Sequence, residues 1–310
     1  MKRLSFLFTL AALLVSFTQV QAQSGQEVIY IKSPKFSSPL IDKWISEYKT
    51  VNPGVLIKQA DKQQENVDLE FTIASEADED TRTADQQITH TGKYALLPVT
   101  SAANPLLDEI SKKKLGKKDI KELFFVVDPL AEEAESKRIK YLDQVTIYSG
   151  NGASSGTEVF ASHFGYRSSD VRGKKISGDD IYLLDAIKKD NTGITFNNPA
   201  YLYDLKTRKL KENLVLVPLD LKKDVFETLA STDVDQVLSL LESQSFDLIP
   251  VQYVGFVSSK NGKKDVSKFL SWVLSEGQKY NHAYGFLQLD EKALAIEKGL
   301  VEKQQLLSVH

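Results

Sequence analysis

The chain of 310 residues contains no cysteine. It therefore forms no disulfide bond and has neither a thiolate metal ligand nor a cysteine nucleophile. The same absence excludes a lipid-modified N-terminal cysteine, so we expect a soluble product that is not tethered to a membrane. The four histidines lie far apart in sequence and lack the spacing of metal ligands.

Long apolar runs are absent after the first 22 residues. Lys2 and Arg3 precede an apolar run over residues 4–17, which is shorter than the ~20 residues of a membrane-spanning helix. Val20 and Ala22 occupy the −3 and −1 positions of a peptidase site. We therefore predict a signal peptide over residues 1–22, cleaved after Ala22. The expected location is the periplasm, with full secretion as an alternative.

Positive charge is not in excess. The chain has 39 Lys and Arg against 42 Asp and Glu, a formal net charge of −3. Removal of the two cations of the signal peptide takes this to −5. The lysine clusters at 112–114 and 117–118 are typical of a solvated helix face, so no nucleic-acid partner is expected.

The mature chain alternates strand and helix patterns, which predicts an α/β fold with mostly parallel sheets. The acidic stretch 76–91 is expected to be a loop or a short exposed helix. A hydroxyl cap is expected at Ser37, and Asp179 with Asp180 is expected to cap a later helix. The expected strands cover residues 28–31, 55–57, 67–73, 94–99, 145–148, 193–196, 214–219 and 246–257, and further helices cover 117–125, 266–280 and 291–307.

About 288 residues remain after cleavage, enough for two domains. Asn104-Pro105 has the character of a crossing point into a second unit, and the strand-rich segment 246–257 would return the chain to the first unit. We therefore predict a discontinuous first lobe, residues 23–103 and 246–310, and a second lobe, residues 104–245.

The segment Ser149–Thr157 is rich in glycine and hydroxyl side chains and lies between a strand and a helix. Its glycines allow the backbone to approach a ligand closely. The first N–H groups of a helix lack backbone partners, and the helix dipole favours negative charge there. The segment is typical of an anion site, although a serine-capped helix after a flexible loop explains the same residues.

A similar junction occurs in the first unit, where Lys35-Phe36-Ser37-Ser38-Pro39 lies between a strand and a helix start. Taken alone, it is an ordinary helix start. Two such junctions in two α/β units indicate a ligand held in a cleft between the units.

Another pattern in the sequence is typical of a serine hydrolase. Residues 152–156 match the G-x-S-x-G of a serine-hydrolase nucleophile elbow, with Ser154 as the nucleophile and Asp247 and His282 following in the expected order. The elbow serine sits directly after a strand, whereas Ser154 lies six residues beyond Tyr148. The sequence also lacks a His-Gly-Gly type oxyanion segment.

The chain resembles the periplasmic phosphate-binding proteins of ABC importers, a branch of the type II periplasmic binding proteins. The resemblance covers most of the mature sequence, and Phe269–Tyr280 is its closest match. It implies an α/β fold of two lobes with a ligand cleft between them. The matching segments occur in the family's order at residues 36–44, 52–55, 74–76, 104–105, 155–160, 185–202 and 269–280.

The departures from the family concern the anion site. Asn151 stands where the family has an arginine, four residues before the serine of its Ser-Gly-Thr loop. Residues 59–64 replace a loop rich in glycine and serine, and Glu76 replaces a shorter acid. Lys35 or Lys93 would have to supply the missing charge, because burial of a doubly charged anion without a cation is costly.

The resemblance and the two junctions together predict a binding protein rather than an enzyme, with no cofactor. Its ligand would be a small oxyanion, phosphate first, and its partner a membrane ABC permease. One alternative keeps the fold with a cleft repurposed for another ligand or a protein partner, and a second is the serine hydrolase. The predicted ligand-binding residues are Lys35, Phe36, Ser37, Ser75, Asn151, Ser154, Ser155, Gly156 and Thr157.

Overall fold

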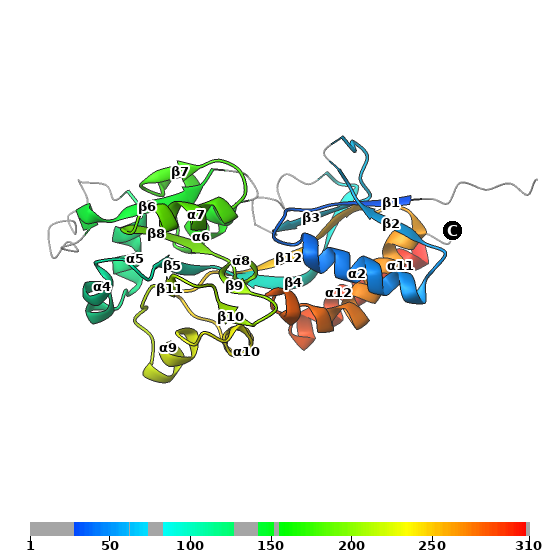
Figure 1. Cartoon of the computed structure of the whole chain (residues 1–310). Coiled ribbons are helices and arrows are strands. Elements are labelled where there is room, and N and C mark those ends of the chain that lie inside the picture. Colours follow the sequence, from blue (N-terminus) through cyan, green and yellow to red (C-terminus); the bar gives the residue numbers. More distant parts are fainter. Residues whose placement is uncertain (1–27, 62, 74–82, 127–141, 152–154, 308–310) are drawn as a thin grey trace, which may run out of the picture.

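Two five-stranded sheets lie side by side, each with its own helices (Figure 1). The computed structural model describes residues 28–61, 63–73, 83–126, 142–151 and 155–307. The predicted signal peptide, Ser75 and Ser154 lie outside these residues. Among the helices described, none is both long enough and apolar enough to cross a membrane.

The first sheet has the strand order β2-β1-β3-β12-β4. The strand β1 pairs in parallel with β2 and β3, whereas β12 pairs antiparallel with β3 and β4. Its strands are β1 (Val28–Lys32), β2 (Leu56–Gln59), β3 (Leu69–Ile73), β4 (Gln86–Ala95) and β12 (Val251–Ser259), and its helices are α2 (Ser38–Val51), α11 (Lys264–Trp272) and α12 (Glu291–Leu307).

The second sheet has the order β11-β5-β8-β6-β7. Here β6 pairs in parallel with β7 and β8, and β5 pairs antiparallel with β8 and β11. Its strands are β5 (Leu97–Ser101), β6 (Thr146–Gly150), β7 (Lys174–Ile176), β8 (Gly193–Asn197) and β11 (Leu214–Leu216). The helices of this lobe are α4 (Leu107–Lys113), α5 (Lys117–Phe124), α6 (Gly156–His163), α7 (Ile181–Lys189), α8 (Pro199–Leu202), α9 (Lys223–Leu229) and α10 (Val234–Ser243).

The α/β class is confirmed, but the expectation of mostly parallel sheets is wrong. Both sheets are mixed, because β5 and β12 run antiparallel to their neighbours. These two strands lie where the chain passes between the lobes. At that point the Leu96 N–H donates a 2.9 Å hydrogen bond to the Pro250 carbonyl, so the two connecting segments lie against each other.

The segment 76–91 also differs from expectation where it is described. Residues 86–91 belong to β4, because pairing along the whole of β12 stabilises a polar sequence as a strand. The single strand expected over 94–99 is two strands divided at Leu96, and β5 already belongs to the second sheet. The division into lobes at residue 103 stays a prediction.

Apolar periodicity predicted the helix faces well. In α2, Leu40, Ile41, Trp44 and Tyr48 are buried at helical spacing. The helix ends at Val51, before Asn52-Pro53-Gly54. The hydroxyl cap expected at Ser37 is not formed, since the Ser37 hydroxyl donates to the Pro34 carbonyl at 2.9 Å instead of accepting from the helix.

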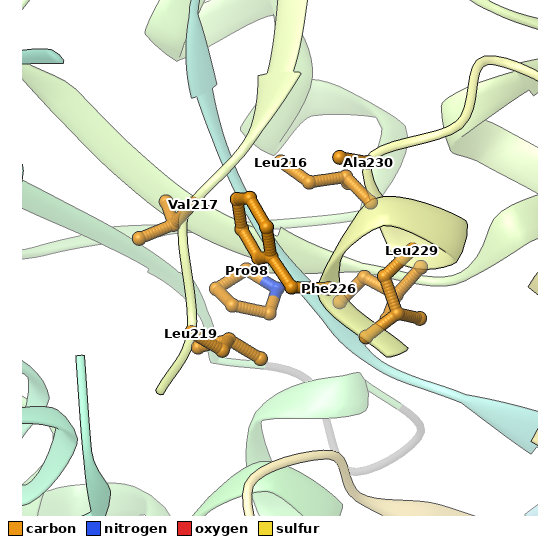
Figure 2. Close-up of a pocket in the computed structure, with 8 residues that line it drawn as sticks. Pro98, Leu216, Val217, Leu219, Phe226, Leu229 and Ala230 are labelled. Carbon is orange, nitrogen blue, oxygen red and sulfur yellow. The ribbon is translucent and has the colours of Figure 1, made fainter. Parts of the chain in front are cut away.

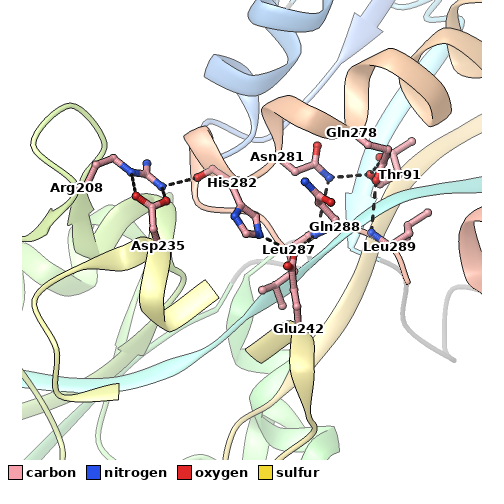
Figure 3. A network of polar contacts seen from close by, with 10 residues as sticks. All are labelled: Thr91, Arg208, Asp235, Glu242, Gln278, Asn281, His282, Leu287, Gln288 and Leu289. Atoms are coloured by element: carbon pink, nitrogen blue, oxygen red, sulfur yellow. Dashed lines mark hydrogen bonds and ion pairs between the residues drawn. The ribbon is translucent and has the colours of Figure 1, made fainter. Parts of the chain in front are cut away.

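Polar contacts connect the lobes near the C-terminal segment (Figure 3). Arg208, between β9 (Tyr203–Asp204) and β10 (Lys209–Leu210), forms a two-pronged pair with Asp235 of α10. Its other N–H groups donate to the carbonyls of His282 and Ala283 at 2.8 and 3.0 Å. His282 Nε2 lies 2.8 Å from Glu242 Oε1, also on α10.

The C-terminal segment is in turn fixed to the first sheet. The Asn281 amide donates to the Thr91 carbonyl at 3.0 Å, and the Leu287 N–H donates to the Lys93 carbonyl at 2.8 Å. Arg208 therefore joins the second lobe to a segment that is held by β4 of the first.

We expect Arg208→Gln to lower the free energy of unfolding by about 1–3 kcal/mol, because two carbonyls and a carboxylate lose a charged donor. Arg167→Gln is the control, since Arg167 is exposed and pairs only within its own turn, with Asp170. Urea unfolding followed by tryptophan fluorescence measures both. Equal losses in the two variants would contradict a joining role for Arg208.

Candidate functional site

The start of α6 is built around Thr157 and the end of β6. Ser155 is the N-cap residue, with extended backbone angles and a buried side chain, and its hydroxyl makes no capping bond. The Gly150 N–H donates to the Thr157 hydroxyl at 2.9 Å, and Thr157 is fully buried. The predicted Ser155, Gly156 and Thr157 therefore lie at the start of α6, next to the end of β6. We call Gly150, Ser155, Gly156, Thr157 and Asp180 the α6 site.

A carboxylate already lies at this helix start. The Gly156 N–H donates to Asp180 Oδ2 at 2.7 Å. Asp179, not Asp180, caps α7, because its Oδ1 accepts from the Ile181 N–H at 2.9 Å while Asp180 makes no capping bond. The Asn197 amide donates to the Asp180 carbonyl at 2.7 Å and fixes its backbone. Asp180 is thus held toward α6.

Burial is the main influence on the Asp180 carboxyl, raising its pKa to about 6. The bond from Gly156 opposes this shift, and the nearby Asp179 carboxylate adds to it. Asp180 Oδ1 is buried and has no hydrogen-bond partner, although the residue as a whole is partly exposed. The favourable partner of this carboxylate is the N-terminal end of α6.

Aromatic side chains of both lobes lie close to the site. Tyr94, from the end of β4, is buried with no hydrogen-bond partner for its hydroxyl, and burial followed by the Asp180 charge raises its pKa. Tyr201 of α8 lies near the same acids, and burial followed by Asp179 raises its pKa. Phe36 stacks on Tyr94 at 5.9 Å and meets Tyr201 edge-on at 6.5 Å between ring centroids.

The residues predicted in the first lobe divide into two kinds. Phe36 and Ser37 are buried, the first in this aromatic cluster and the second in its own turn. Lys35 is exposed. Lys93, the other candidate cation, pairs with Asp290 at 3.2 Å and lies over the Tyr253 ring.

Asn151 does not replace the missing arginine as a charged group. It is exposed, and its amide donates to the Ser177 hydroxyl at 2.9 Å. Among the residues that the structure describes, no Lys or Arg forms an ion pair with Asp180. The α6 site therefore has hydrogen-bond donors and one acid, and within that part of the chain it has no paired cation.

A small apolar pocket lies elsewhere in the second lobe (Figure 2). It opens between β5, β11 and α9, and all of its side chains are apolar, so it has no chemistry for an anion. Its lining residues are Leu97, Pro98, Leu216, Val217, Leu219, Phe226, Leu229 and Ala230.

The hydrolase pattern is not assembled by the described residues. His282 pairs with Glu242, and the Asp247 carbonyl contacts His163 Nε2 at 2.9 Å. The carboxylate beside His282 is thus that of Glu242 and not that of Asp247. The described residues also contain no group of three or more His, Cys, Asp or Glu that could hold a metal ion.

Asp180 and Tyr94 are the site residues that sequence reasoning missed. The sequence predicts Asp180 as part of a helix cap and Tyr94 as the first residue of a strand. The available signal was the doubled acid Asp179-Asp180, because one helix start requires only one capping carboxylate.

Comparison with known proteins identifies the fold. No model of a protein family matches the chain, and no curated protein matches it. A Clostridium perfringens protein proposed to be a phosphate ABC transporter substrate-binding protein, solved with bound phosphate, has a TM-score of 0.59 at 12% identity, over 85% of this chain and 100% of that one. An ABC-type phosphate transport receptor from Vibrio cholerae has a TM-score of 0.55 at 12% identity, with the same coverage. The predicted two-lobed α/β fold of type II periplasmic binding proteins is confirmed.

The raised pKa of Asp180 predicts a pH-dependent stability. Because its folded-state pKa of about 6 exceeds the ordinary aspartate value of 3.8, its stabilising contribution is present at low pH and is lost as pH rises through 6. Relative to Asp180→Asn, we expect the wild-type free energy of unfolding to fall by about 2 kcal/mol from pH 4 to 7.5. Urea unfolding at several pH values measures it, and parallel profiles for the two proteins would contradict the assignment.

Proposed function

We propose that the protein is a periplasmic solute-binding protein that captures a small oxyanion, phosphate first, and delivers it to a membrane ABC permease. The observation that carries the proposal is the start of α6, where a buried, hydroxyl-rich turn lies beside Tyr94 of the other lobe. A helix start of this kind binds anions through free N–H groups. The predicted signal peptide and the lack of cysteine support a freely diffusing exported protein.

The two solved structures of similar fold support the same solute. One was solved with bound phosphate, and the other is named a phosphate transport receptor. At 12% identity the likeness covers the fold alone; phosphate is the first candidate because these two proteins are named for it, and the α6 site supports an oxyanion in general. Ser155, Gly156 and Thr157 are the donors we propose for the ligand, with Ser37, Ser75, Ser154 and Asn151 as further candidates.

A second candidate function is supported by a specific observation. The Gly156 N–H is already bonded to an acid, and the site has Asn151 in place of an arginine. Such a site would suit a fold whose cleft has been repurposed for another ligand or a protein partner. The two candidate functions predict different effects of an added positive charge on phosphate binding.

Isothermal titration of the mature chain with phosphate, sulfate and molybdate, at pH 5 and 7.5, tests the proposal. We expect heat with at least one of the three. No heat with any of them at millimolar concentration, at either pH, would contradict oxyanion capture.

Asn151→Arg tests whether one missing charge limits phosphate binding. We expect about 10-fold or greater tightening, because a charge-assisted hydrogen bond contributes about 1.5–3 kcal/mol. Asn151→Gln is the matched control, since it lengthens the side chain without charge. Unchanged affinity in both variants would favour the repurposed cleft.

A further inference from the structure

The α6 site contains the chain's own anion. Asp180 Oδ2 accepts the Gly156 N–H at 2.7 Å, and this N–H is one of the first of α6. Such a group has no partner within the helix and is where a bound oxyanion would be recognised. The contact reproduces within the chain the hydrogen bond that a solute would receive.

Little space is left beside the two glycines of the α6 site. A methyl group added at Gly150 would lie 2.8 Å from Asp180 Oδ1 and 2.9 Å from the Ser155 Cβ. One added at Gly156 would lie 2.9 Å from Leu96 Cδ2. Neither glycine has room for a methyl group, and Asp180 already accepts the Gly156 N–H, so an oxyanion would have to replace Asp180 in order to accept this N–H.

The filled arrangement leaves polar groups without partners. Asp180 Oδ1 and the Tyr94 hydroxyl are both buried without a hydrogen bond. An unsatisfied buried polar atom is destabilising, because it has lost its hydrogen bonds to water and gained none within the protein. The carboxylate is therefore held in a place that stabilises it incompletely, and a ligand with more acceptors could replace it.

The titratable groups recorded next to Asp180 are acids and tyrosines, and none of them would balance its negative charge. Its neighbours are Asp179 on the same element, Tyr94 from β4 and Tyr201 from α8, and Tyr182 of α7 lies by Tyr201. Within the described part of the chain, none of its recorded partners is a Lys or Arg. The helix end is its main electrostatic support.

We propose that the Asp180 carboxylate is an intramolecular ligand, which occupies the oxyanion position at the start of α6 and must be displaced before a solute oxyanion binds. The proposal rests on the proposed function and adds a regulator to its site. Protonation of Asp180 weakens its hold on Gly156, so the exchange becomes easier at low pH.

Sulfate is the sharpest probe, because its charge stays constant between pH 5 and 8. Titration calorimetry at constant ionic strength should show wild-type affinity falling by about 100-fold from pH 5 to 8, as Asp180 ionises above pH 6. Asp180→Asn should bind with nearly constant affinity, as should Asp180→Ala, which also empties the position. Asp185→Asn is the control, since it removes an exposed acid from the same helix and should follow the wild type.

Two results would overturn the proposal while sustaining oxyanion capture. One is the same affinity and pH profile in wild type and Asp180→Asn, and the other is a flat wild-type profile. Circular dichroism verifies that each variant is folded.

If neither the wild type nor any variant gives heat at any pH, the proposal of oxyanion capture is wrong. The contact between Gly156 and Asp180 is then tested in the ligand-free protein. The Gly156 amide resonance should shift with a midpoint near pH 6 in wild type and lose that transition in Asp180→Asn. A Gly156 resonance that is the same in both proteins would overturn the internal contact itself.

Discussion

The organisation of the site depends on one hydrogen bond, from the Gly156 N–H to Asp180 Oδ2. It satisfies an N–H that α6 cannot satisfy internally, and it joins the start of α6 to the start of α7. Because Asp179 caps α7 separately, the Asp180 carboxylate is free to serve another helix. A site with the form of an anion receptor thus already contains an acceptor.

Residues at the junction of the two lobes lie next to this hydrogen bond. Leu96 lies between the two sheets, at the point where the connecting segments meet, and its side chain fills the space beside Gly156. Phe36 and Tyr94 bring an aromatic surface of the first lobe to the same region. The contact between Gly156 and Asp180 therefore lies next to the packing between the lobes.

Most of the fold could be predicted from apolar periodicity and helix-end signals, as the agreement at α2 and α12 illustrates. The first residues of β4 could not, because their strand form depends on pairing with β12, more than 150 residues later. For the site, Ser155, Gly156 and Thr157 were predictable from local composition. The use of Asp180 was not, since its contact with Gly156 joins residues 24 positions apart and local sequence indicated only a helix cap.

The most direct test of this account is a crystal structure of the mature chain grown with sulfate near pH 5. We predict a sulfate oxygen within hydrogen-bond distance of the Gly156 nitrogen, with the Asp180 carboxylate turned away from α6. A structure with sulfate bound between the lobes and the contact between Gly156 and Asp180 intact would contradict it.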